Sequence, residues 1–148
     1  MQLSRQADYA VRAMVDLAAL PEGGRATIAE LARRQAMPAG FLKRIIPQLA
    51  AAGLLYTHRG ERGGVALARS AETISLLEIV EAVAGPICLN RCLVRPGECS
   101  LDRRCAVHAV WMAAQHDLRQ RLASARLADL AGPATAGLEA PAASEPQR

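Results

Sequence analysis

Apolar residues recur at helical spacing near the start of the chain. Ser4 is a candidate N-cap, and the apolar positions after it return every three or four residues as far as Ala18. Pro21 and the glycines Gly23 and Gly24 then interrupt the pattern. The pattern predicts one amphipathic helix that begins just after Ser4 and ends before Pro21.

Two further helices are predicted over residues 27–52. Thr27 and Glu30 have the spacing of a capping box, in which each side chain bonds to the backbone of the other residue. Pro38 opens the next apolar pattern, since proline is favoured in the first turn of a helix, and Gly53 closes it. Two short helices joined by a tight turn are typical of a helix-turn-helix.

Two short apolar runs follow, at Leu54–Thr57 and Val65–Leu67, and a basic segment rich in glycine separates them. This arrangement predicts a β-hairpin. A second capping box at Ser75 and Glu78 opens a helix that continues to about Val83. The order of these elements predicts a winged helix-turn-helix, so the expected fold is mainly α with a small β-hairpin wing.

The last predicted helix runs from about Cys105 to about Arg126. Its apolar residues form one stripe: Val107, Trp111, Ala114, Leu118 and Leu122. The stripe lies beyond the winged helix, so we expect a second copy of the chain to cover it in a homodimer. The predicted organisation is a winged-helix domain (1–84), a cysteine-containing loop (85–105), a long C-terminal dimerisation helix (106–131) and a disordered tail (132–148).

Composition narrows the functional class. The chain has 148 residues, of which 51% are hydrophobic and 3% aromatic, which suits one domain with an appendage. No uncharged apolar run reaches the length of a membrane span, and the first residues lack an apolar secretion signal. Reduced cysteines and the cytoplasm are therefore expected. No Ser/His/Asp pattern or phosphate-binding glycine loop is present, so an enzyme is not expected.

The charge distribution indicates a partner. The net charge is +4, and the first 64 residues hold nine basic against five acidic residues. A winged helix places its second helix in the major groove of double-stranded DNA and its hairpin tip on phosphates or in the minor groove. The residues expected to contact DNA are Thr27, Ala39, Gly40, Lys43, Arg44, Arg59 and Arg62. A dimer would bind a two-fold symmetric operator; alternatively, these charges only solvate the surface.

All four cysteines fall within 18 residues, with the spacing Cys88-x3-Cys92-x6-Cys99-x5-Cys105, and His108 follows. Thiolates beside an imidazole are ligands for soft metals and iron–sulfur clusters. Structural zinc sites usually pair their ligands roughly two to four residues apart, which only the first two cysteines satisfy. The wider gaps favour a larger group such as an iron–sulfur cluster. Alternatively, cysteine is a small core residue, a role that fits Cys88 at the end of an apolar helix but not four cysteines in a polar loop.

Several short motifs follow one another in a distinctive order. They are Asp8-Tyr-Ala-Val-Arg12, Phe41-Leu42, Gly53-Leu54, Arg59-Gly60-x-x-Gly63-Gly64, the spaced cysteines and Leu127-Ala-Asp-Leu130. In this order they resemble the Rrf family of winged-helix regulators, which includes IscR, NsrR and RirA, over about residues 1–131. The resemblance implies a homodimer joined by the C-terminal helix, with the second helix and wing on DNA. It also implies an iron–sulfur cluster held by Cys92, Cys99 and Cys105, which leaves Cys88 as an expected bystander.

The resemblance leaves two residues open as the fourth cluster ligand. In IscR-like members a histidine three residues past the last cysteine completes the site, and His108 matches it. In NsrR-like members an aspartate on the first helix of the partner subunit does so, and Asp8 matches it. We favour Asp8 with a 4Fe–4S cluster over His108 with a 2Fe–2S cluster. Otherwise Asp8 would form a surface ion pair with Arg12 or Arg5, and His108 would be a polar residue of the dimer helix.

The sequence therefore predicts a homodimeric DNA-binding transcriptional regulator that senses redox state, iron or nitric oxide through an iron–sulfur cluster. One alternative keeps the DNA-binding domain and makes the cysteines a zinc site or a thiol redox switch. A second alternative is an iron–sulfur carrier or assembly partner that does not act on DNA.

Overall fold

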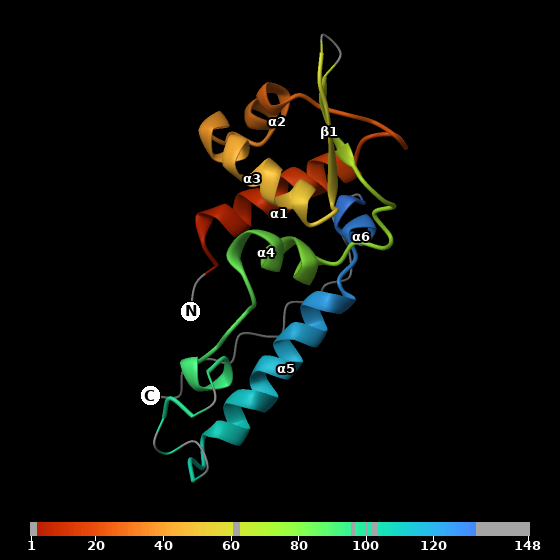
Figure 1. Cartoon of the computed structure of the whole chain (residues 1–148). Coiled ribbons are helices and arrows are strands. Elements are labelled where there is room, and N and C mark those ends of the chain that lie inside the picture. Colours follow the sequence, from red (N-terminus) through yellow and green to blue (C-terminus); the bar gives the residue numbers. More distant parts are fainter. Residues whose placement is uncertain (1–2, 61–62, 96, 100, 102–103, 133–148) are drawn as a thin grey trace, which may run out of the picture.

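The structure is a computed structural model that describes residues 3–60, 63–95, 97–99, 101 and 104–132. Its elements are α1 (Arg5–Ala18), α2 (Ile28–Arg34), α3 (Ala39–Ala51), β1 (Leu55–His58), β2 (Gly64–Leu67), α4 (Leu76–Ala84), the 3₁₀-helix η1 (Arg91–Leu93), α5 (His108–Ser124) and α6 (Leu127–Ala131). Figure 1 shows a head, formed by α1–α4, the hairpin and α6, from which α5 projects. The expected mainly α fold with a small β-hairpin wing is confirmed. Apart from Gly132, the expected disordered tail lies outside the described residues.

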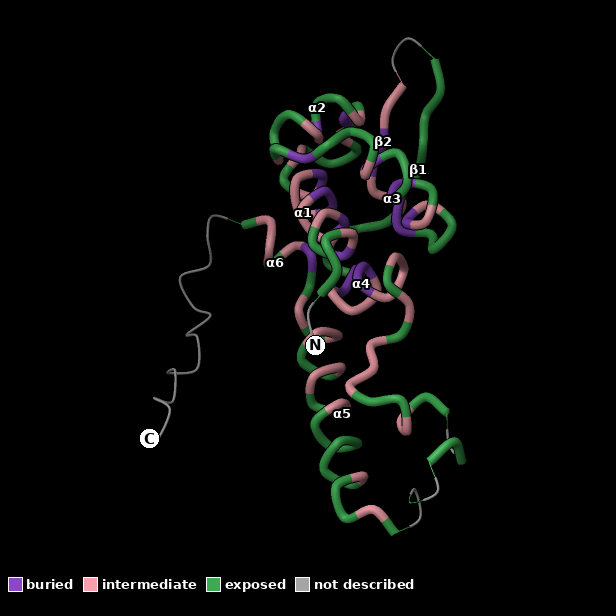
Figure 2. Tube along the Cα trace, turned by 90° about the vertical axis from the view of Figure 1, so that its left-hand side faces the viewer, coloured by how far each residue is buried: buried purple, intermediate pink, exposed green. Residues whose placement is uncertain are grey.

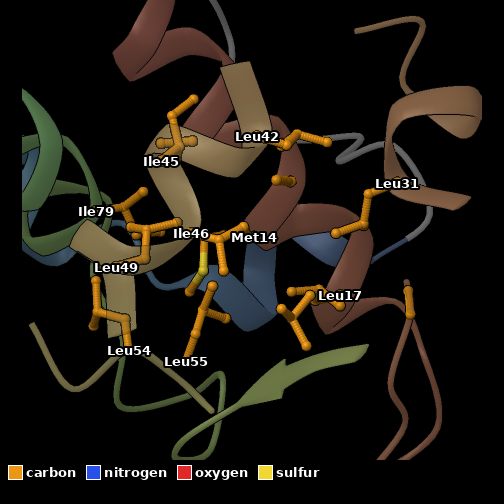
Figure 3. Packing of buried hydrophobic residues seen from close by; sticks show 14 of the residues in the cluster. Met14, Leu17, Leu31, Leu42, Ile45, Ile46, Leu49, Leu54, Leu55 and Ile79 are labelled. Carbon is orange, nitrogen blue, oxygen red and sulfur yellow. The ribbon is translucent and has the colours of Figure 1, made fainter. Parts of the chain in front are cut away.

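The helix α1 lies at the centre of the head. The Ser4 hydroxyl accepts a hydrogen bond from the Ala7 backbone N–H at 3.2 Å, which confirms the predicted N-cap. Most buried side chains of α1 are small, so α3, α4, α6 and β2 can pack closely against it. Figure 3 shows Met14 and Leu17 of α1 among the larger apolar side chains of the core.

The predicted helix-turn-helix is formed by α2 and α3. The Thr27 hydroxyl accepts from the Glu30 N–H at 3.2 Å, and the Glu30 carboxylate accepts from the Thr27 N–H at 2.7 Å, so the capping box is confirmed. Ala36 has a φ of 49°, a left-handed conformation that turns the chain from α2 towards α3. Pro38 caps α3 instead of lying in its first turn, one residue away from the predicted start.

The wing is the antiparallel hairpin of β1 and β2, in which His58 lies opposite Gly64. Val65 also exchanges backbone hydrogen bonds with Ala26, at 2.8 and 3.0 Å, which attaches the hairpin to the segment before α2. Gly64 has a φ of 154°, and a Cβ atom there would lie 2.9 Å from the Ala26 carbonyl oxygen. Glycine at this position therefore allows the hairpin backbone to lie close to the Ala26 backbone.

The helix α4 begins at the second predicted capping box. The Ser75 hydroxyl accepts from the Glu78 N–H at 3.3 Å, and the Glu78 carboxylate accepts from the Ser75 N–H at 2.8 Å. Gly85 ends the helix with a φ of 76°, a conformation that side chains other than glycine rarely adopt. The chain then enters the cysteine-containing loop.

The C-terminal segment differs from the prediction of one helix over 106–131. The helix α5 ends at Ser124, because Ala125 has an extended backbone with φ −73° and ψ 109°. The Leu127 N–H donates to the Ile74 carbonyl at 2.9 Å, and the Leu127 side chain is fully buried. Residues 127–131 therefore form α6 within the head. The turn of the chain back to the head removes the Leu127 side chain from water, whereas continuation of α5 would leave it exposed.

The helix α5 contains no buried residue. Figure 2 shows the buried positions gathered in the head, whereas α5 is exposed or half-buried along its length. Of the predicted stripe, Leu118 and Leu122 are half-buried, and Val107 and Trp111 are exposed. Within the described part of the chain, no helix combines the length and apolar character needed to cross a bilayer.

Replacing Leu127 with alanine tests the return of the chain to the head. Because Leu127 is fully buried, Leu127→Ala should lower the free energy of unfolding by about 2–5 kcal/mol. Leu101→Ala is the control, since Leu101 is 59% exposed and its truncation should cost less than about 0.5 kcal/mol. Chemical denaturation measures both values, and equal losses would contradict the burial of Leu127.

A charged contact holds α2 on α1. The Arg34 guanidinium donates to the two carboxylate oxygens of Asp16 at 3.1 and 2.9 Å, and the Gln35 amide donates to one of them at 3.0 Å. Burial by itself raises the pKa of Asp16. The bonds from Arg34 and Gln35 and the charge of Arg34 outweigh burial, so the pKa of Asp16 lies below its usual value.

This lowered pKa predicts an acid-sensitive stability. The contact stabilises the fold above the unfolded-state pKa of about 3.9, and its contribution is lost as the pH falls through the lower folded-state pKa. At neutral pH, Asp16→Asn should therefore unfold at a lower urea concentration than the wild type. The difference between the two midpoint concentrations should shrink in acid. Asp117→Asn, at an exposed position of α5, is the control. A difference independent of pH would contradict the assignment.

Candidate nucleic-acid interface and metal centre

The exposed side of α3 carries four residues that the sequence assigns to DNA contact. Ala39, Gly40, Lys43 and Arg44 are all exposed. The opposite side of α3 is buried in the core through Leu42, Ile45, Ile46 and Leu49. The packing of α3 thus presents two cations beside two small residues, an arrangement that lets a double helix approach the backbone while arginine and lysine reach base edges or phosphates.

Thr27 and the hairpin extend this surface. Thr27 is exposed at the N-cap of α2, and a pocket of about 350 Å³ lies between it and His58 near the tip of the wing. Arg59 is exposed directly after β1, whereas Arg62 lies outside the described residues. The sequence prediction omits His58, although its position beside Arg59 at the end of a strand is a signal that could have identified it. Contact of each residue with DNA stays a prediction.

A pocket of about 300 Å³ brings together the three cysteines that the resemblance assigns to a cluster. Cys92 lies in η1, Cys99 in the loop after it, and Cys105 shortly before α5. His108, the first residue of α5, lines the same pocket. The rest of the lining comes from Asn90, Arg91, Glu98 and Trp111. Three separate segments therefore contribute soft ligands to one cavity.

The donor set of this pocket fits a soft metal or an iron–sulfur cluster. Nδ1 of His108 is buried and has no hydrogen-bond partner among the described residues. A buried polar nitrogen without a partner is costly, and a bond to a metal would satisfy it. Among the described residues, no group of three or more His, Cys, Asp and Glu side chains is already arranged to hold a metal ion.

Cys88 and Asp8 do not line this pocket. The Cys88 thiol donates to the Asn90 carbonyl at 2.8 Å, and its expected bystander role stays a prediction. Asp8 is exposed on α1 and forms an ion pair with Arg12 at 3.7 Å, the surface contact expected if Asp8 is not a ligand. Its predicted role as a ligand concerns the pocket of a second subunit and stays a prediction.

The start of the loop is anchored to both α4 and α5. The Glu81 carboxylate of α4 accepts from the Ile87 N–H at 2.9 Å and forms an ion pair with Arg119 of α5. The Gln115 side-chain carbonyl of α5 accepts from the Leu89 N–H at 3.0 Å. Figure 1 shows the loop running beside α5. A rearrangement at the cysteine pocket would therefore act on a segment that is bonded to both helices.

Comparison with known proteins identifies relatives over nearly the whole chain. The profile of the Rrf2 family, described as an iron-dependent transcriptional regulator, matches residues 3–133. The helix-turn-helix transcriptional regulator IscR of Xenorhabdus nematophila is 33% identical over 124 residues, which cover 84% of this chain and 73% of that protein. IscR of Escherichia coli is 33% identical over 122 residues, 82% of this chain and 72% of that protein. These matches confirm the resemblance predicted from the short motifs.

Solved structures share the fold. IscR of T. potens is 27% identical, with a TM-score of 0.68 and coverage of 88% of this chain and 85% of that chain. CymR, the global cysteine regulator of B. subtilis, is 24% identical with a TM-score of 0.72, and the match covers 88% of this chain and 96% of that one. At this identity the similarity to CymR shows the fold alone.

Proposed function

The chain belongs to the Rrf2 family of transcriptional regulators, and we propose that it is a homodimeric regulator that senses redox state, iron supply or nitric oxide through an iron–sulfur cluster. Its relatives and its fold make it a helix-turn-helix regulator of transcription. The proposal adds the cluster, the signal, the dimer and an action on chromosomal DNA in the cytoplasm. The observation that supports the proposal most strongly is that three cysteines and one histidine line the same pocket.

We assign the cluster to Cys92, Cys99 and Cys105, with His108 as the fourth ligand. The buried Nδ1 atom of His108, which has no partner among the described residues, supports this choice because it lies in the same pocket as the thiols. The preference therefore moves from Asp8 with a 4Fe–4S cluster to His108 with a 2Fe–2S cluster. Asp8 of the partner subunit is the alternative. When bound, the cluster would supply a group that oxidants, iron shortage or nitric oxide can alter.

The bonds at the start of the loop support a route from the pocket to the DNA-binding surface. Glu81 and Gln115 hold Ile87 and Leu89 of the loop, and Asn90, the next residue, lines the pocket. A change in how the cysteines are held would pull on these bonds, and thereby on α4 and α5. The helix α4 packs against α1 and α3. The proposed response is a shift between two arrangements of the loop that differ in DNA affinity.

The exposed apolar side chains of α5 support the proposed dimer. Val107, Val110 and Met112 are about half or more exposed, and Trp111 is 39% exposed. Apolar side chains gathered on one projecting helix are typical of a surface that another chain covers. A second copy packed on α5 would place two heads side by side, which is the geometry that reads a two-fold symmetric operator.

Anaerobic reconstitution with iron and sulfide tests the cluster. The wild-type protein should gain visible absorption and retain iron and sulfide, and Cys92→Ala, Cys99→Ala and Cys105→Ala should each lose them. Cys88→Ala is the matched control and should behave as the wild type, since Cys88 lies outside the pocket. Absorption spectra and metal analysis report the result. A colourless protein with stoichiometric zinc, or one that holds no metal and forms disulfides, would refute the proposal.

Replacing the two candidate fourth ligands separates their roles. His108→Ala should change the visible spectrum and speed the loss of the cluster to a chelator by about tenfold or more, because one bond to the cluster is missing. Asp8→Ala should retain the wild-type spectrum and rate. Stopped-flow absorption under anaerobic conditions measures both. The opposite pattern would transfer the fourth ligand to Asp8 of the partner subunit.

A further inference from the structure

Two arginines and two aromatic rings form a continuous row of contacts between α1 and α3, which we call the stack. The ring centres of Tyr9 and Phe41 are 5.3 Å apart, and the ring planes meet at 84°, an edge-to-face pair. The guanidinium carbon of Arg44 lies 4.7 Å from the centre of the Phe41 ring. That of Arg12 lies 5.9 Å from the centre of the Tyr9 ring. Both cations are within the range of a cation–π interaction, so the stack runs Arg44, Phe41, Tyr9, Arg12.

One end of the stack is anchored and the other is exposed. Arg12 donates a hydrogen bond to the Gln35 carbonyl at the end of α2 and forms the ion pair with Asp8. Tyr9 and Phe41 are half-buried and pack against the core. Arg44 is exposed on the side of α3 that faces away from the core. The stack therefore connects a rigid part of the head to a cation on the proposed DNA-binding surface.

We propose that Phe41, supported by Tyr9, is a positioning residue that holds the guanidinium of Arg44 ready for DNA. A free arginine loses conformational entropy when it is ordered on binding, and a contact made beforehand reduces that cost. A guanidinium can stack on a ring and still donate in-plane hydrogen bonds to two neighbouring acceptors. The proposal rests on the DNA-binding part of the proposed function and adds a role for Phe41, a residue that the sequence does not assign to DNA contact.

The position of Lys43 offers an internal comparison. Lys43 is exposed on the same helix and carries the same charge as Arg44, but it is not a member of the stack. Loss of the Phe41 ring should therefore affect binding through Arg44 and leave the contribution of Lys43 unchanged. This difference separates positioning from a general loss of charge or from a distorted α3, either of which would affect both cations.

A double-mutant cycle on DNA affinity tests the proposal. The probes are a short duplex that the full-length wild-type protein enriches from a random-sequence library, and a random duplex of equal length. Arg44→Ala should weaken binding to the enriched duplex by roughly tenfold, and Phe41→Leu by about twofold to fivefold. The double variant should bind no more weakly than Arg44→Ala, because the ring acts only through Arg44. Phe41→Tyr keeps a ring and should retain wild-type affinity.

A second double-mutant cycle, which pairs Phe41 with Lys43, is the control, and its two losses of DNA affinity should multiply. Lys43→Ala combined with Phe41→Leu should weaken binding by the product of the two single effects. If Arg44→Ala loses equal affinity on both duplexes, Arg44 contacts phosphate. If the loss is confined to the enriched duplex, Arg44 contacts a base edge. The Phe41–Arg44 cycle supports positioning in either case. Multiplied losses for Phe41→Leu and Arg44→Ala would overturn the inference, as would unchanged affinity in either variant.

Two further results keep the test decisive. If circular dichroism shows that Phe41→Leu does not fold, Arg44→Lys replaces it, because this exposed substitution keeps the charge and removes the planar stacking group. Arg44→Lys should lose about twofold to fivefold in affinity, and wild-type affinity would overturn the inference. A wild-type protein that binds neither duplex would overturn the proposed function as well, which distinguishes that failure from failure of the inference alone.

Discussion

Close packing against the buried side of α1 is the constraint on which the head depends. Ala7, Ala10 and Ala13 are completely buried, and their small size lets neighbouring helices approach the α1 backbone. Larger side chains at these positions would force the helices apart. Through this one surface α1 orients α3 with its exposed cations, α4 with the start of the loop, and α6 with the return of the chain. The relative placement of the candidate sites therefore depends on the same set of apolar contacts.

The two parts of the molecule are held by different interactions. Fully buried apolar side chains such as Met14 and Ile79 stabilise the head, and each contributes roughly 1.5–3 kcal/mol. The loop is held by polar bonds from Glu81 and Gln115, each of which exchanges with water at a net cost of about 0.5–1.5 kcal/mol. The loop can therefore rearrange at a smaller free-energy cost than the head. That difference suits the proposed function, in which the loop rearranges while the DNA-binding head keeps its structure.

Some charged side chains of the head stabilise the fold, and others stay exposed on the proposed DNA-binding surface. Asp16 and Arg34 satisfy one another between α1 and α2, and the Glu30 carboxylate is used in the cap of α2. These pairs position the helix-turn-helix without adding to its attraction for a polyanion. Lys43 and Arg44 stay exposed on α3. The packing of the head thus separates cations that stabilise the fold from cations that are available to DNA.

The sequence alone determined the features that depend on neighbouring residues. The N-caps at Ser4, Thr27 and Ser75, the helix-turn-helix and the hairpin were all predictable, because caps, turns and helical periodicity involve residues only a few positions apart. The spacing of the cysteines likewise indicated a shared site. The family followed from short motifs in a fixed order.

Tertiary structure decided the rest. Only the packed head shows that Leu127 returns to the core and ends α5 early, because that choice depends on space beside α1. Likewise, only the packing of α1 on α3 brings Tyr9 against Phe41. These contacts join residues distant in sequence, and local propensity does not encode them.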